Sequence, residues 1–583
     1  MRVCLSILFF LVAGNSLSIS GESSPPPPKR EVRAVWITTA SGLDWPRTTD
    51  KEEQQSSLRD IVHELKAAHF NTIFFQARAR GDAYYRSSYE PWAENLTGTI
   101  GKYPGWDPLT FLLAEAHAAG MEAHAWFNVF KIRGPIPVEM SLPQHPTIAH
   151  PQWVVQVEGE SWFDPGLPDV RTYLLRVALE IVKLYEIDGI HFDFVRYPGR
   201  TFPDDESYRR YGRGRNRDEW RRANIDTFIT DFYDAAVALK PMLKVGSAPI
   251  GVYNGLSDGN GSGSYSRYFQ DSQGWLQKRK HDYLVPQVYW DIGVSQGDPD
   301  FALLVRKWQQ GTAGRHIYIG IGAYKPGVAR EIPTQIDTVR TNGLGGEAFF
   351  RYENIKQFGL LDNRYRTLAN IPPMSWKDSI PPLEPTNLIV SEITPSVFRL
   401  DWKPPGPAPD GDRARYYNIY RSPSPGINTD DPETIVAITA SDVSSFVDTI
   451  TSPGPPVYYY AVSAFDKGNN ESPPTQVTGG TVREMFALSG KLSNTTSLSI
   501  SVAHGEGLPV LVGFRLSERV FVSLDLLEKK NDASESLSAT LMSGPRDGGT
   551  YVVGIPRERC TPGRYVIRLT AEDTALEEPV DLR

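Results

Sequence analysis

A regular alternation of strand-like and helix-like segments runs from residue 31 to about residue 370. Strands that alternate with helices form parallel sheets, and eight of them can close into a (β/α)8 barrel. An open doubly wound sheet is the alternative, but polar residues near the carboxyl ends of the strands favour a barrel mouth. The expected strands are Val32–Thr38, Asn71–Arg78, Met121–Asn128, Asp188–Arg196, Leu243–Pro249, Tyr283–Trp290, His316–Gly322 and Gly345–Arg351. The expected helices are Lys51–Ala68, Pro108–Gly120, Asp169–Tyr185, Asp218–Lys240, Tyr265–Lys280, Asp300–Gly311 and Ile332–Asn342.

The chain is too long for one hydrophobic core. Its 583 residues predict roughly three or four folded units. After a Pro-rich stretch the pattern changes to short strands of period two, which predicts small all-β domains. The fold class is therefore α/β, a (β/α)8 TIM barrel followed by two small all-β sandwich domains. The expected boundaries are a signal peptide at 1–21, a Pro-rich spacer at 22–30, the barrel at 31–370, a Pro-rich linker at 371–385, and β domains at 386–482 and 485–583.

The N-terminus has the layout of a secretory signal peptide. Arg2 precedes the apolar run Leu5–Ala13, which is too short to span a membrane, and small polar residues follow it. Removal of this segment leaves Cys560 as the only cysteine, so the mature chain would have no internal disulfide. We expect a secreted or periplasmic protein without a membrane span. The formal charge of −8 argues against a general nucleic-acid binder.

The fourth expected strand ends in a carboxylate. Side chains alternate along a strand, so His191 and Asp193 share one face, while Phe192 and Phe194 share the other. A charged side chain at the end of an apolar strand is costly to bury unless it is paired or used. Asp193 is therefore either a structural hydrogen-bond acceptor or a catalytic carboxylate at the barrel mouth.

Other polar and aromatic residues stand near the ends of the strands, where active sites of such barrels lie. Each alone is more often a packing or hydrogen-bonding residue of the core. Together they suit a carbohydrate, because aromatic rings stack on sugars, and amide and guanidinium groups bind hydroxyl pairs. The candidates are Arg33 and Trp36 (first strand), Gln76, Arg78 and Asp82 (second), His124, Trp126 and Asn128 (third), His191, Asp193 and Arg196 (fourth), Gln287, Tyr289, Trp290 and Asp291 (sixth), and Glu347 (eighth).

Five ordered motifs resemble the bacterial glycosyl-hydrolase-like proteins of the cell envelope, over residues 31–370. They are Glu31–Thr39, Gln76–Tyr85, His124–Asn128, Asp188–Pro198 and Pro286–Trp290. The resemblance implies a secreted (β/α)8 hydrolase that acts on the glycan strands of peptidoglycan. In one place the chain departs from the family pattern, which has two adjacent aspartates at the fourth strand; the second is Phe194 here.

The two β domains resemble modules that usually act as spacers or adhesion domains. Residues 386–482 resemble a fibronectin type III domain, with Trp402 in an early strand and an aromatic run, Tyr458–Phe465, in a late one. Tyr458, Tyr460, Val462 and Ala464 should face its core. Residues 485–583 resemble a small immunoglobulin-like domain. These modules suggest association with the cell surface.

Glycoside hydrolysis usually needs two carboxyl groups. Asp193 is the first choice, as nucleophile or base, because Arg196 or Arg78 could keep it ionised. Asp291 ranks first as its partner, followed by Glu347 and Asp82. Val195 occupies the glutamate position of chitinase-type enzymes, which disfavours substrate-assisted chemistry. No cofactor is expected, and metal catalysis is weakly supported because the chain has no His-Glu-x-x-His motif.

A basic cluster, Arg209–Arg217 with Arg221 and Arg222, follows the fourth strand. It is interpreted as a solvated loop and helix start, or as a contact with an anionic glycan or cell-wall polymer. Two rival functions remain: a glycan-binding or adhesion protein that has lost the chemistry, and a lyase or deacetylase on the same scaffold. The expected partner is a polysaccharide, with peptidoglycan glycan first.

Overall fold

The computed structural model describes residues 25–582 apart from 134–142, 255–262, 294–298, 358–363, 395–396, 441, 451–456, 482–497, 504–509, 517–519, 532–533, 547–548, 556–562 and 572–573. The expected signal peptide and Cys560 therefore lie outside the described residues.

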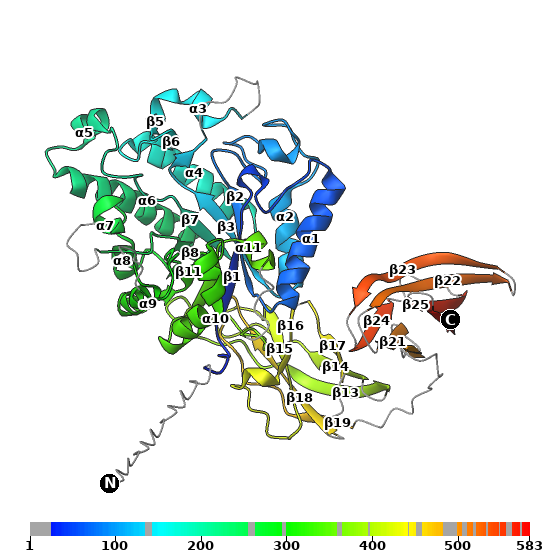
Figure 1. The fold of residues 1–583 in the computed structure, drawn as a ribbon. Helices are drawn as coiled ribbons and strands as arrows, with labels where there is room; N and C mark the ends of the chain where they lie inside the picture. Colours follow the sequence, from blue (N-terminus) through cyan, green and yellow to red (C-terminus); the bar gives the residue numbers. More distant parts are fainter. Residues whose placement is uncertain are drawn as a thin grey trace, which may run out of the picture.

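A parallel β/α barrel forms the larger part of the molecule (Figure 1). Its strands are β1 (Val32–Ile37), β2 (Thr72–Arg78), β3 (Glu122–Asn128), β7 (Gly189–Asp193), β8 (Lys244–Ser247), β9 (Tyr283–Leu284), β10 (His316–Ile317), β11 (Ile319–Ile321) and β12 (Gly346–Phe349). They pair in the order β10-β9-β8-β7-β3-β2-β1-β12-β11. Only Tyr318 separates β10 from β11, so the two fill one position and the sheet closes on itself. The barrel prediction is confirmed and the open sheet is wrong.

Helices cover the outside of the barrel (Figure 1). The long ones are α1 (Lys51–Ala67), α2 (Pro108–Ala118), α4 (Pro168–Leu184), α6 (Arg217–Leu239), α9 (Phe301–Gln310) and α10 (Pro326–Thr341). Aspartates cap several of them; Asp107, for example, accepts a hydrogen bond from the Thr110 N–H at the start of α2. Smaller elements lie in the loops: α3 (Pro146–Ala149), α5 (Asp205–Tyr211), α11 (Tyr352–Gln357), β4 (Lys131–Ile132), β5 (Val154–Val157) and β6 (Glu160–Phe163), with the 3-10 turns η1 (Ala40–Gly42), η2 (Glu94–Leu96) and η3 (Pro151–Trp153).

One expected helix is divided in the structure. Instead of Tyr265–Lys280, the chain forms α7 (Ser264–Arg267) and α8 (Ser272–Gln277). Phe269 between them has a φ of 56°, in the left-handed region, which a continuous right-handed helix does not allow. Tyr268, in the turn after α7, lies beside Arg196, whose Cζ atom is 5.0 Å from the centre of the Tyr268 ring.

A directed chain of hydrogen bonds crosses the barrel interior. Trp36 can only donate, and its Nε1 lies 3.0 Å from His191 Nε2. His191 therefore donates from Nδ1 to the Tyr283 hydroxyl (3.1 Å), which donates to His124 Nδ1 (2.8 Å). His124 Nε2 in turn donates to Glu122 (3.1 Å). Burial holds the pKa of His191 well below its usual value, in keeping with a neutral ring.

A β-sandwich follows the barrel. One sheet pairs β13 (Thr386–Thr394), β14 (Val397–Lys403) and β17 (Ser445–Thr449); the other pairs β16 (Ile435–Ala440), β15 (Tyr416–Ser422), β18 (Val457–Phe465) and β19 (Thr478–Thr481), with the turn η4 (Pro432–Thr434). Tyr460, Val462 and Ala464 are buried in its core beside Trp402, as expected, whereas Tyr458 is only partly buried. That the sandwich is a fibronectin type III domain stays a prediction.

The C-terminal part is also antiparallel β structure. Its sheets pair β20 (Leu498–Ala503), β21 (Val510–Leu516) and β24 (Gly549–Ile555), and β23 (Ser534–Arg546), β22 (Val520–Asn531), β25 (Gly563–Ala571) and β26 (Thr574–Leu582). Among the helices that the structure describes, none has both the length and the hydrophobicity needed to cross a bilayer.

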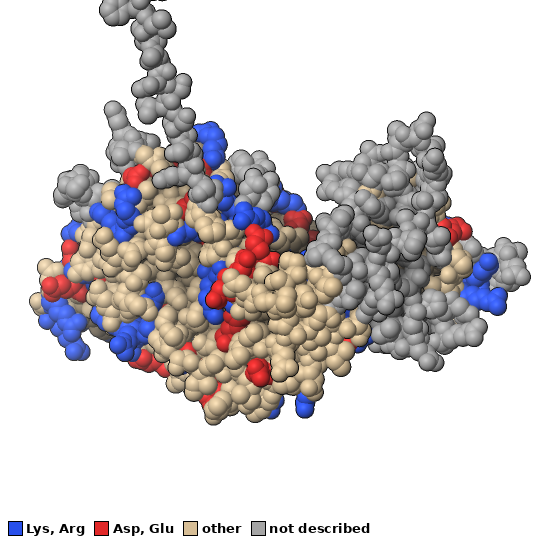
Figure 2. Space-filling view, turned by 90° about the horizontal axis from the view of Figure 1, so that it is seen from below, with Lys and Arg blue, Asp and Glu red and all other residues tan. Residues whose placement is uncertain are grey.

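The sandwich docks on the N-terminal ends of the barrel strands, below the barrel in Figure 1. Arg415 of the sandwich pairs with Asp188, just before β7, and the Asn469 amide donates to Glu122 on β3. Lys29, just before the barrel, pairs with Glu471 of the sandwich (2.6 Å). Seen from below, acidic and basic side chains are interspersed over this end of the molecule (Figure 2).

Candidate active site

Asp193 ends β7 and lies at the carboxyl end of the barrel strands, where the sequence predicted a mouth. Its side chain faces the barrel interior and is 9% exposed. One carboxylate oxygen accepts hydrogen bonds from the Phe194 N–H (2.7 Å) and from Gln287 Nε2 (3.2 Å). Burial raises the pKa of Asp193 to about 6, because desolvation outweighs the attraction of Arg196.

This pKa corrects one expectation. Neither arginine keeps the carboxyl group fully ionised: Arg78 binds Glu90 in the helix layer, and the effect of Arg196 is too weak. A carboxyl group with a pKa raised toward neutrality can hold a proton and donate it, which is what a general acid requires.

The strand ends at Asp193, not at Arg196, because Phe194 leaves the extended conformation. Phe194 has a φ of 50°, so the alternation of faces stops there. Its ring packs edge-on against Trp162, with ring centres 5.7 Å apart. Lys131 Nζ lies 4.9 Å and Arg196 Cζ 5.2 Å from the centre of the Phe194 ring.

A small antiparallel sheet in the loop after β3 brings two of these partners to the mouth. Its strands pair in the order β4-β6-β5, with Lys131 on β4 and Trp162 on β6. Glu160 on β6 pairs with Lys131 (2.5 Å). Lys131, Glu160 and Trp162 were not among the sequence candidates, because they come from an insertion rather than from a barrel strand.

The residues after β9 form the opposite side of the site. Burial raises the pKa of the Tyr289 hydroxyl well above its usual value, and the nearby Asp193 carboxylate adds to the shift. The Tyr289 ring also contacts Tyr324 (6.0 Å) and Phe350 (5.8 Å). Tyr324 is exposed in the loop after β11 and was not predicted from the sequence.

Asp291 belongs to this side as well. It lines a cavity of about 160 Å³ together with Tyr289, Trp290, Lys325 and Gly327. A Cβ atom on Gly327 would lie 2.5 Å from an Asp291 oxygen, so the carboxylate sits at the start of α10. The positive end of a helix dipole favours a negative charge at such a position.

Three predicted candidates lie away from the mouth. A bulge in β2 turns Arg78 to the outer face, where it binds both oxygens of Glu90 (2.6 and 2.8 Å), so Gln76 and Arg78 do not share a face. Arg33 also faces the helix layer and pairs with Glu31 (2.7 Å). Glu347 lies beside Arg33 in the β1–β12 register. Burial raises the pKa of Glu347 to about 8, and Tyr365 donates to it.

The remaining candidates build the frame of the mouth. Gln76 accepts hydrogen bonds from the Thr39 and Ala40 N–H groups (3.0 and 2.8 Å) and holds the loop after β1. Asn128 accepts from Trp126 (2.8 Å), and the Asp82 carboxylate accepts from the Arg80 N–H (2.9 Å). Trp36, His124 and His191 belong to the interior chain of hydrogen bonds.

Asp44, in the loop after β1, is a buried residue that the sequence did not reveal. Its carboxylate accepts from the Thr38 N–H (2.8 Å) and the Glu353 N–H (2.9 Å), and it pairs with Arg351 (2.5 Å). It therefore ties the first barrel loop to the last.

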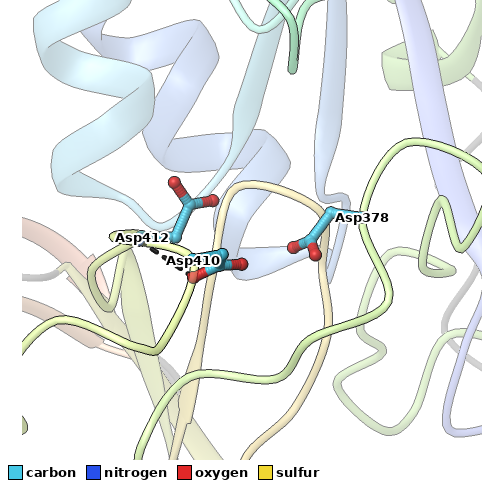
Figure 3. Close-up of side chains that lie close together, drawn as sticks. All are labelled: Asp378, Asp410 and Asp412. Atoms are coloured by element: carbon cyan, nitrogen blue, oxygen red, sulfur yellow. Dashed lines mark hydrogen bonds between the residues drawn. The ribbon is translucent and has the colours of Figure 1, made fainter.

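A larger cavity, of about 990 Å³, lies at the other end of the barrel. Residues of the barrel base and of the sandwich line it. Asp378, Asp410 and Asp412 gather on its wall, with carboxylate oxygens within 4.8 Å of one another (Figure 3). Asn470 donates to Asp378 (3.0 Å). Because catalysis in these barrels takes place at the carboxyl ends of the strands, this cluster is separate from the Asp193 site.

Comparisons with known proteins agree with this geometry. Residues 31–337 match the family model described as "Glycosyl hydrolase-like 10". "Glycosyl hydrolase YngK" of Bacillus subtilis (strain 168) is 31% identical over 484 residues, which cover 77% of this chain and 93% of that protein. "Glycosyl hydrolase DigH" of Escherichia coli (strain K12) is 32% identical over 332 residues, covering 52% of this chain and 75% of that protein.

Among solved structures, the glycoside hydrolase domain of PgaB (BpsB) from Bordetella bronchiseptica is similar with a TM-score of 0.41 and 13% identity, covering 57% of this chain and 96% of that domain. The family match spans more than half of the chain, and the YngK relative is covered almost throughout. The chain belongs to the glycosyl hydrolase-like 10 family.

Proposed function

We propose that this protein is a secreted glycoside hydrolase that cleaves the glycan strands of peptidoglycan, with Asp193 as the general acid. The observation that carries the proposal is a buried carboxyl group at the barrel mouth whose pKa is raised to about 6. It lies between Gln287 and Tyr289 on one side and Phe194 on the other. Membership of a glycosyl hydrolase-like family supports the reaction class, and the five motifs of the barrel support the substrate.

In the proposed reaction the protonated Asp193 gives its proton to the glycosidic oxygen as the bond to the sugar breaks. Asp291 is the proposed second carboxylate, acting as nucleophile or as base for a water molecule. Its carboxylate lies at the start of α10 and lines the small cavity beside Tyr289. Asp193 then serves as the acid and Asp291 as its partner, which are the two carboxyl groups that glycoside hydrolysis needs.

Aromatic rings on both sides of Asp193 supply sugar-binding surfaces. Tyr289, Tyr324 and Phe350 contact one another on one side. On the other side the half-buried Phe194 offers its ring, and the buried Trp162 packs edge-on against it. A glycan strand that crosses the mouth would stack on both and place a linkage over Asp193.

Secretion is part of the proposal. It is supported by the charged residue, apolar run and small polar residues of segment 1–21. The β domains beyond the barrel suit attachment at the cell surface.

The test is release of sugar fragments from purified peptidoglycan, with and without stem peptides, and from a panel of neutral polysaccharides. We expect cleavage of peptidoglycan by the wild type and a loss of about 100-fold to 10,000-fold in Asp193→Asn. Asp60→Asn is the matched control, since Asp60 is exposed on α1. Full activity in Asp193→Asn would remove Asp193 from the reaction. Asp291→Asn tests the second carboxylate in the same assay.

Glycan binding without hydrolysis is the second candidate. Phe194 favours it, because the family pattern has an aspartate at that position. Retained binding to peptidoglycan with no fragment release by the wild type would select this function.

A further inference from the structure

A group of cations lies on the Phe194 side of Asp193. Arg196 touches three aromatic rings: its Cζ atom is 5.2 Å from the centre of Phe194, 5.4 Å from Trp162 and 5.0 Å from Tyr268. Lys131 covers the other part of Phe194 at 4.9 Å. The aromatic surface beside the proposed acid is therefore edged by two positive charges.

Arg196 has no carboxylate partner among the described residues. Among the same residues its side chain donates one hydrogen bond, from Nη1 to the Tyr197 carbonyl oxygen (3.3 Å). Asp193 is near enough to attract it but forms no ion pair with it, and burial lowers the pKa of Arg196. A half-buried guanidinium group without a partner costs folding free energy, and four of its five N–H groups have no hydrogen-bond partner among the described residues.

The positive charge continues outward along the segment that follows β8. Arg267 lies 5.5 Å from the Tyr268 ring, on the ring that Arg196 also touches. Arg222 of α6 lies 4.3 Å from the Tyr265 ring and donates to the Tyr265 carbonyl oxygen (3.3 Å). In the part of the chain that the structure describes, neither arginine is paired with a carboxylate. We call Lys131, Arg196, Arg222 and Arg267 the cationic wall.

Among the described residues, two acidic side chains lie close to the wall: Asp193 attracts Arg196 without an ion pair, and Glu160 attracts Arg196 and pairs with Lys131. Glu160 binds Lys131, but its own side chain is 48% exposed, so solvent weakens this pair. The wall keeps a net positive charge beside a surface suited to a sugar ring. An acidic sugar would meet both requirements, since its ring stacks on the half-buried Phe194, which the buried Trp162 supports, while its carboxylate accepts a forked hydrogen bond from Arg196.

We propose that the cationic wall is a specificity site for a glycan whose sugars carry free carboxylates, with Arg196 as the residue that reads the charge. This proposal rests on the proposed glycosidase function in one respect, which is that it places the wall beside the bond that is cleaved. Binding of an acidic glycan to the wall does not require that the bond be cleaved. Arg196 is a specificity-determining residue and takes no part in proton transfer.

The experiment measures binding by calorimetry with the full chain carrying Asp193→Asn, so that no glycan is consumed. The probes are peptidoglycan glycan strands freed of stem peptides and the same strands after chemical reduction of their carboxylates to alcohols. We expect the intact strands to bind at least tenfold more tightly, which corresponds to about 1.4 kcal/mol. The difference should shrink as salt is raised, because exposed charges are screened. Equal affinity for the two probes would overturn the proposal.

Adding Arg196→Gln to this protein should abolish the preference while leaving the affinity for the reduced strands unchanged. Arg209→Gln is the matched control, since Arg209 is exposed on α5 and outside the wall. Because Arg196 packs on three rings, Arg267→Gln and Lys131→Gln serve as milder variants, and each should reduce the preference about twofold to fivefold. A preference that survives all three substitutions would overturn the assignment.

A second acidic polysaccharide, hyaluronan, identifies the source of the carboxylate. Tight binding of both intact polysaccharides would show that the wall binds acidic sugars in general. Binding of the peptidoglycan strands alone would show that the position of the carboxylate on the sugar also matters. Either result supports the proposed specificity site. If the wild type cleaves no glycan yet the charge preference is present, the glycosidase proposal fails and the cationic wall stands.

Discussion

At the scale of single residues, Asp193 shows how much of a site residue's environment the strand pattern predicts. The period-two alternation correctly placed Asp193 and His191 on the interior face. It did not reveal that burial would outweigh Arg196, because the balance depends on how much water the surrounding rings exclude. Nor could it show that Phe194 adopts a left-handed conformation and turns its ring toward Trp162.

The pKa of Asp193 leads to a prediction about pH. A general acid works in its protonated form, so kcat/KM should fall as the pH rises through about 6, and approach a tenfold loss per unit above it. A nucleophile or base would show the opposite limb, with activity rising through the same pH. A pH profile of fragment release from peptidoglycan distinguishes the two roles.

At the scale of elements, the strands and helices of the barrel could be predicted from the sequence, but the bulge in β2 could not. All eight barrel positions were predicted because apolar runs and helical stretches alternate clearly. The bulge between Gln76 and Arg78 leaves no such signal, since it changes the direction of side chains without changing their composition. The same holds for the inserted sheet β4-β6-β5, whose residues reach the mouth by tertiary packing.

The outward position of Arg78 has a measurable consequence. Arg78 and Glu90 are both fully buried and hydrogen-bonded to each other, so Arg78→Met should strand a buried carboxylate and lower the free energy of unfolding by about 3–5 kcal/mol. Adding Glu90→Gln should restore part of this loss. Denaturant unfolding measures both, with the exposed Arg80→Met as control. A loss below about 1 kcal/mol would contradict the buried pair.

At the scale of the whole molecule, the sandwich covers the base of the barrel and supplies partners to its buried carboxylates. Burial alone would raise the pKa of Asp188, but Arg415 and His117 hold it well below its usual range. Similarly, Lys244 holds the pKa of Glu122 at about 2 although the group is buried. Glu122, Asp188 and Lys244 stand near the starts of expected strands, and Arg415 stands within the expected domain 386–482. The pattern of the sequence does not match a barrel carboxylate with an arginine more than two hundred residues away.

The Asp188–Arg415 pair predicts how stability depends on pH. Because the pKa of Asp188 is depressed in the folded protein, its contribution is present above the unfolded value of about 4 and is lost as the pH falls below it. Arg415→Met should therefore lower the free energy of unfolding by about 3–5 kcal/mol at pH 7, with a smaller effect near pH 3. Thermal unfolding at both pH values tests this, with the exposed Arg413→Met as control. An effect of equal size at both pH values would contradict it.

The hydrogen-bonded chain through the barrel interior ends at Glu122, which also accepts a hydrogen bond from Asn469 of the sandwich. A chimeric protein built from this barrel should therefore keep residues 29–481 together as one folding unit. Truncation at the Pro-rich linker would expose the carboxylates of Asp188 and Glu122 to water. It would also remove the Asn469 hydrogen bond to Glu122, where the hydrogen-bonded chain from Trp36 ends. The C-terminal β domain can be replaced at a junction placed after β19, the last strand of the sandwich.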